Sequence, residues 1–264
     1  MKKHKIGLAL ALFFIIAAFY ATGCKNEAPA DYFPIGVGSY WEYMAYTTYP
    51  TGIAQISKDI YVVGGQEMVG DQECYRIDYF TLQNGTPSVA NYREFLAKTK
   101  DGIFCNKRAF PLLQYPAIDW ELRNSPGEPR FKTGMKDGDT WKWEGFVTLQ
   151  PESTPAPAST PGSSATSTTG NQKQTKFIQI KGKFDYEYKG KEQLTILDRK
   201  MDCIKIYVHA VSEDKQEYER FIWYAPGIGK VREETTFYKG SDVIKTLLEL
   251  SSYNITNREM FKKK

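Results

Sequence analysis

The chain has 264 residues, of which 41% are hydrophobic and 25% are charged, a composition typical of a folded protein with a sizeable core. Its formal net charge is +4, and removal of Lys2, Lys3 and Lys5 with the N-terminal segment leaves 32 basic against 31 acidic residues, a net charge of +1. Because a nearly neutral protein lacks a strong overall field, we expect no nucleic-acid partner and no general selection of acidic substrates.

The first 23 residues are typical of an export signal. Three lysines precede the apolar run from Ile6 to Tyr20, which is short for a membrane span and is followed closely by small residues. The sequence Ala21-Thr22-Gly23-Cys24 resembles the lipobox of bacterial lipoproteins. This resemblance implies that residues 1–23 are a lipoprotein signal peptide and that Cys24, carrying acyl chains such as palmitate, begins the mature protein. An ordinary cleaved signal with an incidental cysteine is the alternative.

Residues 24–31 are then the acylated cysteine and a short polar tether, so we expect the following domain to work at a membrane surface with the lipid bilayer as partner. A lipoprotein N-terminus normally carries more than one chain, so Cys24 suffices as an anchor. Lys25, where an aspartate would signal retention, favours the outer membrane facing the periplasm by resemblance to Gram-negative lipoproteins. The cell surface is the other location considered.

Short β-prone segments alternate with turn signals along the rest of the chain. The segments rich in Tyr, Val, Ile, Thr and Phe are Asp59–Val63, Cys74–Leu82, Asn91–Lys98, Phe177–Lys183, Cys203–Val211, Glu217–Tyr224 and Val231–Tyr238. The turn signals are Gly64-Gly65, Asn84-Gly85, Asp101-Gly102 and Pro226-Gly227. No long stretch has helical periodicity, so the sequence predicts an all-β, antiparallel fold.

The segment from Cys203 to Val211 shows the clearest alternation. Its apolar face consists of Ile204, Ile206, Val208 and Ala210, and its other face of Lys205, Tyr207 and His209. This pattern is typical of a half-buried strand. His209, the one histidine left after signal cleavage, is therefore predicted on the solvent side and outside a catalytic pocket.

Three motifs recur in the same order and indicate a tandem duplication. The pattern GxxWx followed by an aromatic residue occurs at Gly38–Tyr43 and Gly138–Trp143. Sequences around Cys74 and Cys203 are similar, as are Tyr92–Phe95 and Tyr218–Phe221 with the Gly-Ile that follows each. We predict a first β repeat over 32–132, a second over 133–255 and a basic tail over 256–264.

Each repeat would be an open sheet with one uncovered apolar face. Joining the two into a curved sheet, a clam or a partly closed barrel would bury that face and remove exposed edges. The glycine before each aromatic pair is predicted to form a tight turn with positive φ. The aromatic residues singled out are core residues or ligand-lining residues, and both alternatives stay open: Trp41, Tyr43, Trp141, Trp143 and Trp223.

Residues 150–174 form a Pro-, Ser-, Thr- and Gly-rich tract with almost no apolar side chains to bury. Such a segment cannot offset the entropy of ordering. A domain linker is the usual interpretation, but the repeat places the tract between consecutive strands of one module, so we predict a disordered surface insertion.

Two further motifs extend the aromatic signature. Tyr32-Phe33-Pro34 precedes Gly38, Trp41 and Tyr43, and the late segment Trp223–Val231 reads WYAPGIGKV. Together they resemble an uncharacterised bacterial envelope lipoprotein family with YFPxxxGxxWxY and WxAPGxGxV motifs. The resemblance covers most of the mature chain and implies a β-rich envelope lipoprotein, but it brings no catalytic residues. It leaves the Ser/Thr/Pro tract unexplained.

Cys74, Cys105 and Cys203 are disulfide candidates in an exported protein, although an odd number leaves one unpaired. Cys74 and Cys105 flank a predicted three-strand meander, which separates their strands by roughly 9 to 10 Å, too far for a disulfide. We predict buried thiols.

No motif for a serine hydrolase, zinc protease, zinc ribbon or phosphate loop occurs. We expect no catalytic residues, no cofactor and no metal site. The leading hypothesis is a non-enzymatic envelope lipoprotein that binds an apolar or lipidated ligand. A structural or assembly module for another envelope protein is the alternative. A polymer hydrolase, with acids such as Asp119, Glu121, Asp185 and Glu187, is the third hypothesis.

Overall fold

The computed structural model describes residues 31–83, 86–87, 92–111, 119–151, 178–211 and 217–256. The chain divides into two compact units, Met1–Asp31 and Tyr32–Lys264, and every described strand belongs to the second. The predicted signal peptide, Cys24 and most of the tether lie outside the described residues, as do most of the predicted insertion 150–174 and nearly all of the predicted tail 256–264.

The second unit consists of antiparallel strands. Their bounds are β1 Tyr40–Thr48, β2 Ala54–Val69, β3 Gln72–Gln83, β4 Thr86–Pro87, β5 Tyr92–Thr99, β6 Gly102–Pro111, β7 Asp119–Lys132, β8 Thr140–Pro151, β9 Ile178–Ile196, β10 Arg199–Val211, β11 Glu217–Ala225, β12 Gly229–Lys239 and β13 Asp242–Asn254. The described ranges hold no helix long and apolar enough to cross a membrane.

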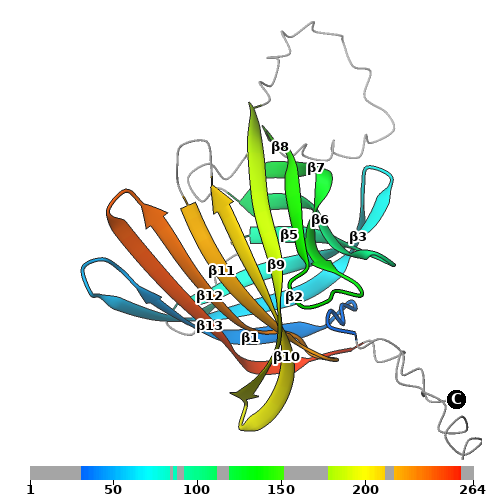
Figure 1. Ribbon diagram of the computed structural model, residues 1–264. Coiled ribbons are helices and arrows are strands. Elements are labelled where there is room, and N and C mark those ends of the chain that lie inside the picture. Colours follow the sequence, from blue (N-terminus) through cyan, green and yellow to red (C-terminus); the bar gives the residue numbers. More distant parts are fainter. Residues whose placement is uncertain are drawn as a thin grey trace, which may run out of the picture. The chain divides into compact units, whose positions relative to one another are not determined.

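The strands form one sheet that returns to its starting point. Strand β1 pairs with β2 on one side and with β13 on the other. Between these, each long strand pairs with the next one along the chain, and β3 pairs with β5 beside the two-residue β4. The sheet therefore curls into a barrel shape (Figure 1). The predicted all-β fold with a curved sheet or partly closed barrel is confirmed.

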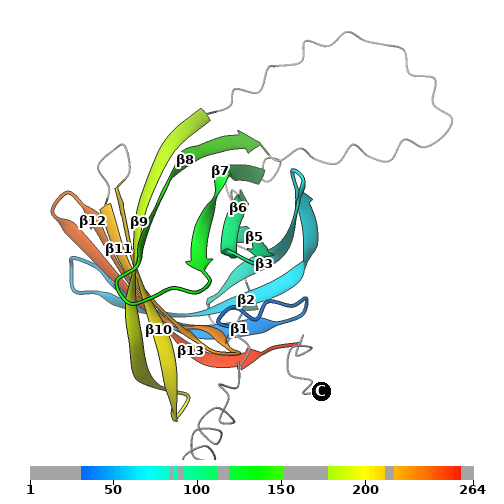
Figure 2. The same cartoon turned by 45° about the vertical axis from the view of Figure 1, so that its right-hand side comes forward.

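One seam of the sheet is incomplete. Residues 120–125 of β7 pair with residues 146–151 of β8, but the facing ends of the two strands carry no further pairing. Two indole groups span these ends: Trp143 Nε1 donates to the carbonyl oxygen of Pro126 at 2.8 Å, and Trp141 Nε1 to that of Pro129 at 3.5 Å. Figure 2 shows β7 and β8 beside each other at this seam. Side-chain hydrogen bonds thus replace the missing part of the ladder.

Of the four predicted turns, two are confirmed, one is wrong and one lies outside the described residues. Asp101-Gly102 lies at the β5–β6 junction and Pro226-Gly227 joins β11 to β12, as predicted, whereas Asn84-Gly85 is outside the described residues. The turn predicted at Gly64-Gly65 is wrong, because β2 continues through both residues with a register shift against β3. A Cβ on Gly64 would lie 2.3 Å from a carboxylate oxygen of Asp78, so this glycine permits a close approach between strands.

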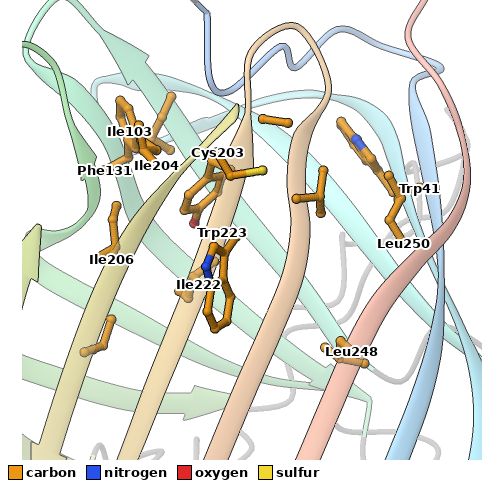
Figure 3. Packing of buried hydrophobic residues seen from close by; sticks show 14 of the residues in the cluster. Trp41, Ile103, Phe131, Cys203, Ile204, Ile206, Ile222, Trp223, Leu248 and Leu250 are labelled. Atoms are coloured by element: carbon orange, nitrogen blue, oxygen red, sulfur yellow. The ribbon is translucent and has the colours of Figure 1, made fainter. Parts of the chain in front are cut away.

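The alternation predicted in β10 is confirmed. Its four apolar residues are buried on one face, whereas Lys205, Tyr207 and His209 are partly exposed. Ile204 and Ile206 belong to the main hydrophobic cluster, together with Ile222 of β11 and Leu248 of β13 (Figure 3). The apolar contacts that stabilise the unit therefore lie mainly inside the curved sheet.

Both glycines that precede an aromatic pair have positive φ, as predicted. The φ angle is +85° at Gly38 and +83° at Gly138, just before β1 and β8. Strands β1 to β7 fall within 32–132 and strands β8 to β13 within 133–255. The tandem origin of the two halves stays a prediction.

Cys74, Cys105 and Cys203 are buried thiols, as expected. Strand β5 lies between the strands of Cys74 and Cys105, and the two thiols belong to different hydrophobic clusters. Burial raises the pKa of Cys105 to about 12 and that of Cys203 to about 11. These thiols are therefore protonated and poorly reactive at neutral pH.

Candidate functional site

The inner side of the sheet contains a cavity of about 570 Å³. Its volume falls within the range of about 300–1,000 Å³ that is typical of small-molecule sites. The aromatic part of its wall consists of Phe33, Trp41, Tyr43, Tyr61, Tyr79, Tyr92, Phe184, Tyr218 and Tyr224. The charged part consists of Glu94, Arg108, Arg130, Arg220, Lys230 and Glu233. The cavity thus combines a large aromatic surface with a compact set of charges.

The segment before β1 contributes to one wall. Phe33 lies 5.8 Å from the Tyr224 ring of β11, measured between ring centroids. Trp41 Nε1 donates a 2.6 Å hydrogen bond to the carbonyl oxygen of Ile228, and Pro34 lies beside Gly229 at the start of β12. A side chain at Gly229 would approach both Pro34 and Trp41, and its φ of +99° also favours glycine.

Four tyrosines on neighbouring strands form a continuous row in the wall, called here the tyrosine row: Tyr43, Tyr61, Tyr79 and Tyr92. Successive ring centroids are 4.7, 4.2 and 4.7 Å apart. Lys230 Nζ lies 4.8 Å from the centroid of Tyr61, a distance suited to a cation–π contact. Burial raises the pKa of all four tyrosines well above the usual range, so their hydroxyl groups stay neutral donors.

A buried ion-pair network lies next to the tyrosine row and consists of Glu94, Glu128, Arg108 and Arg130. Each carboxylate contacts both guanidinium groups. Tyr79 and Tyr92 also donate hydrogen bonds to Glu94, the former at 2.6 Å. Tyr186 donates to Glu128 at 2.6 Å, and Glu128 is fully buried.

Burial by itself would raise the pKa of Glu94 and Glu128, because it disfavours the charged carboxylate. The nearby Arg130 and Arg108, with the tyrosine hydroxyls, outweigh this effect and hold both pKa values below the usual range. The two carboxylates are therefore ionised at neutral pH. They balance the charges of the two arginines inside the sheet.

Arg220 and Glu233 form a second charged group. The distance between Arg220 Nε and a Glu233 oxygen is 3.3 Å, and Lys230 Nζ reaches the other Glu233 oxygen at 2.7 Å. Thr235 also donates to Glu233, at 3.2 Å. Burial would raise the pKa of Glu233, but Arg220 and Lys230 lower it to about 2.

The predicted aromatic residues are all buried, but only some line the cavity. Trp41 and Tyr43 belong to the wall. Trp141 stacks on Tyr186 with ring centroids 5.2 Å apart, and Trp143 lies 5.3 Å from Phe184. These two residues pack against their cross-strand partners on β9, and their indole N–H groups bridge the incomplete seam to β7.

Trp223 is buried away from the cavity. Its neighbours Ile222 and Tyr224 line the wall, so strand alternation places Trp223 on the opposite face of β11. There its Nε1 donates to Glu192 at 2.9 Å, and Lys205 Nζ lies 4.7 Å from a ring centroid. Cys24, the predicted lipidation site, is outside the described residues.

The polar residues considered for catalysis lie apart from the cavity where they are described. His209 Nε2 contacts Glu217 at 2.7 Å, and neither residue lines the cavity. Asp185 and Glu187 alternate with inward Phe184 and Tyr186 and pair with exposed lysines. The side chains of Asp119 and Glu121 are outside the described part. Within the described ranges, no group of three or more His, Cys, Asp or Glu residues is arranged for a metal.

Sequence reasoning missed the charged residues of the wall. Arg220 stands between Tyr218 and Ile222 at spacings of two residues, and Glu94 stands likewise between Tyr92 and Leu96. The sequence signal that could have revealed these wall residues is a charged residue on a strand face that is otherwise apolar or aromatic. The two charges also occupy equivalent positions in the repeated motifs Tyr92–Phe95 and Tyr218–Phe221.

The chemistry of the cavity is suited to binding. Glu94 and Glu233 are ionised and held by cations, so their pKa values do not match a proton-transfer role near neutral pH. The aromatic wall supplies apolar area, while tyrosine hydroxyls and arginine N–H groups supply donors. Such a lining fits a molecule with apolar and polar parts.

No protein-family model and no curated protein matches the chain. Among solved structures, it is similar to a lipoprotein candidate from Parabacteroides distasonis at 16% identity, with a TM-score of 0.45 over 86% of this chain and 100% of that chain. An exported-protein candidate with a YmcC-like fold from Bacteroides fragilis has 14% identity and a TM-score of 0.42, over 85% and 99% of the two chains. The hypothetical lipoprotein YmcC from Escherichia coli has 13% identity and a TM-score of 0.33, over 89% and 95%. Likeness at this level says nothing about a ligand or partner.

Proposed function

We propose that this protein is a non-enzymatic envelope lipoprotein that binds an apolar or lipidated ligand inside its curved sheet. The observation that carries the proposal is the aromatic cavity of about 570 Å³. A protein acting purely as a scaffold gains nothing from such a space, because empty volume costs packing contacts. The cavity therefore favours ligand binding over the alternative of an assembly module.

The lipid anchor in this proposal comes from the sequence. The lipobox-like Ala21-Thr22-Gly23-Cys24 supplies the acylated residue, and the tether up to Asp31 is short. A domain held close to a bilayer meets lipids and lipidated proteins at high local concentration. Anchor and cavity then serve the same task, which is to take up an apolar group at a membrane surface.

The test uses the chain from Lys25 onward, which keeps the complete compact unit Tyr32–Lys264. Native mass spectrometry of this protein, purified from bacteria without detergent, is expected to show a bound lipid-sized mass that organic extraction removes. A fluorescent apolar probe is expected to bind the extracted protein in a saturable manner and to be displaced by the extract.

A variant with a filled cavity tests whether the probe binds inside the sheet, and a variant with the same side chain at the surface is its control. Ile77→Trp together with Ile222→Trp places two large rings in the wall and is expected to weaken probe binding at least tenfold. Val211→Trp introduces the same side chain at an exposed position and is expected to bind the probe normally. The proposal fails if the purified protein is empty and binds no probe, or if the filled variant, folded by circular dichroism, binds as well as the original.

A further inference from the structure

Arg220 is the charged residue of the wall whose donors are least used. Its Nε is buried without a hydrogen-bond partner, and its only ion pair in the described part of the chain is the 3.3 Å contact with Glu233. None of the described residues accepts a hydrogen bond from its guanidinium group. A guanidinium group carries five N–H donors in a planar fork, so Arg220 presents an unfilled bidentate donor site to the cavity.

The surroundings of Arg220 favour a negative group. Glu233 is already shared among Arg220, Lys230 and Thr235, so it does not fully neutralise the arginine. Glu233 and Glu94 attract the guanidinium group of Arg220, while the positive charge of Arg130 repels it. The carboxylates of the ion-pair network are occupied by Arg108 and Arg130. An additional oxyanion beside Arg220 would gain a charge-assisted hydrogen bond and reduce this repulsion.

The cavity wall continues from Arg220 into apolar surface. Ile222 and Tyr224 follow it on the same face of β11, and Phe33 packs against Tyr224 in the same wall. A molecule whose charged end reaches Arg220 would therefore lay its remaining length against hydrophobic side chains. This combination of a charged group and apolar surface is complementary to an amphiphile, whereas a small inorganic anion would leave the apolar wall without a contact.

We propose that the cavity binds a single-chain amphiphile with one anionic head group, and that the guanidinium group of Arg220 holds the head group oxygens while the aromatic wall holds the chain. This proposal rests on the proposed function and specifies its ligand class. The shared head group chemistry is that of a carboxylate or a phosphate monoester, which correspond to a fatty acid and to a phosphate-headed lipid.

Isothermal titration calorimetry with three twelve-carbon probes tests the proposal on the lipid-extracted chain from Lys25 onward. Dodecanoate and dodecyl phosphate are expected to bind roughly tenfold to a hundredfold more tightly than dodecanol, because only the anions form charge-assisted hydrogen bonds with Arg220. The stronger of the two anions identifies the source of the head group.

Substitutions of Arg220 locate the interaction. Arg220→Gln is expected to reduce binding of both anions to the level of dodecanol and to leave dodecanol binding unchanged. Arg220→Lys keeps the positive charge but lacks the planar set of guanidinium N–H donors, so it is expected to bind both anions with an affinity between those of the original protein and Arg220→Gln. This variant tests the proposal if Arg220→Gln does not fold. Arg232→Gln, at an arginine paired with Glu234 outside the cavity wall, is the matched control and is expected to bind all probes normally.

The outcomes separate the two proposals. Equal binding of all three probes, or anion binding that survives both Arg220 substitutions, would overturn the role of Arg220 and leave the proposed function standing. Failure of every probe to bind would count against the proposed function itself.

Discussion

Charged residues inside the sheet contribute to stability only as a complete set. Glu128 shows this most clearly, because its fully buried carboxylate contacts Arg108, Arg130 and Tyr186. A buried ion pair adds little compared with apolar packing, but removal of one partner leaves a buried charge without compensation. The stability of the protein is therefore sensitive to a single substitution of any charged residue in this network.

We expect Glu128→Gln to lower the free energy of unfolding by about 3–5 kcal/mol, because two guanidinium groups lose a shared counter-charge. Urea unfolding followed by tryptophan fluorescence measures the change. Glu187→Gln is the control: Glu187 pairs with Lys189 at a partly exposed site, where a salt bridge contributes about 1 kcal/mol or less. Equal losses of unfolding free energy in the two variants would show that the buried network is no more important for stability than a surface ion pair.

At the scale of the strand, periodicity was a good guide wherever one face is apolar and the other polar. Strand β10 follows this pattern residue by residue. Strand β2 does not, because its Gly64-Gly65 pair looks like a turn but lies within the strand. The reason is tertiary: Asp78 and Arg76 of β3 occupy the space that a Cβ at Gly64 would need. A contact with another strand cannot be predicted from the local sequence of β2.

The connection between β8 and β9 offers a test at the same scale. Leu149 and Ile178 are direct partners in the ladder, so a short loop can join the two strands. Replacement of residues 152–177 by six Gly and Ser residues is expected to preserve the fold and to raise the free energy of unfolding by about 1 kcal/mol through the shorter loop. Urea unfolding measures stability, and probe binding measures function. Loss of binding with an intact fold would assign the tract a recognition role.

At the scale of the whole molecule, the interior charges couple stability to pH. Glu94, Glu128 and Glu233 all have pKa values below the ordinary value near 4.5, and that of Glu233 is about 2. The folded protein therefore binds fewer protons than the unfolded chain between these values. This stabilisation is complete above about pH 5 and is lost as the pH falls toward 2. Asp59, whose pKa is raised by burial, acts in the opposite direction.

We expect the urea midpoint to decrease steadily from pH 5 to pH 3. Glu233 alone is expected to account for about 2 kcal/mol of the loss between pH 7 and pH 3, given its pKa of about 2. The variant Glu233→Gln should be less stable at pH 7 and show a shallower dependence on pH. A midpoint that is unchanged or higher at pH 3 would contradict this account.

The sequence by itself determined the local features of the fold. Alternating residues predicted β10, β-prone segments and turn signals predicted the antiparallel fold, and the glycines before Trp41 and Trp141 predicted positive φ. The acylation of Cys24 stays a prediction from the lipobox-like segment. These features depend on neighbouring residues in the chain, where backbone sterics and side-chain periodicity act.

Only the tertiary structure decided which strands close the sheet and which faces enclose the cavity. Pairing of β1 with β13 joins residues about two hundred positions apart, and it brings Trp41 and Tyr43 opposite the start of β12. The same closure turns Arg220 inward, toward Glu233 of the next strand. The residue pattern places Arg220 on the same strand face as Tyr218 and Ile222, but only the closed sheet shows that this face lines a cavity shared with Glu233.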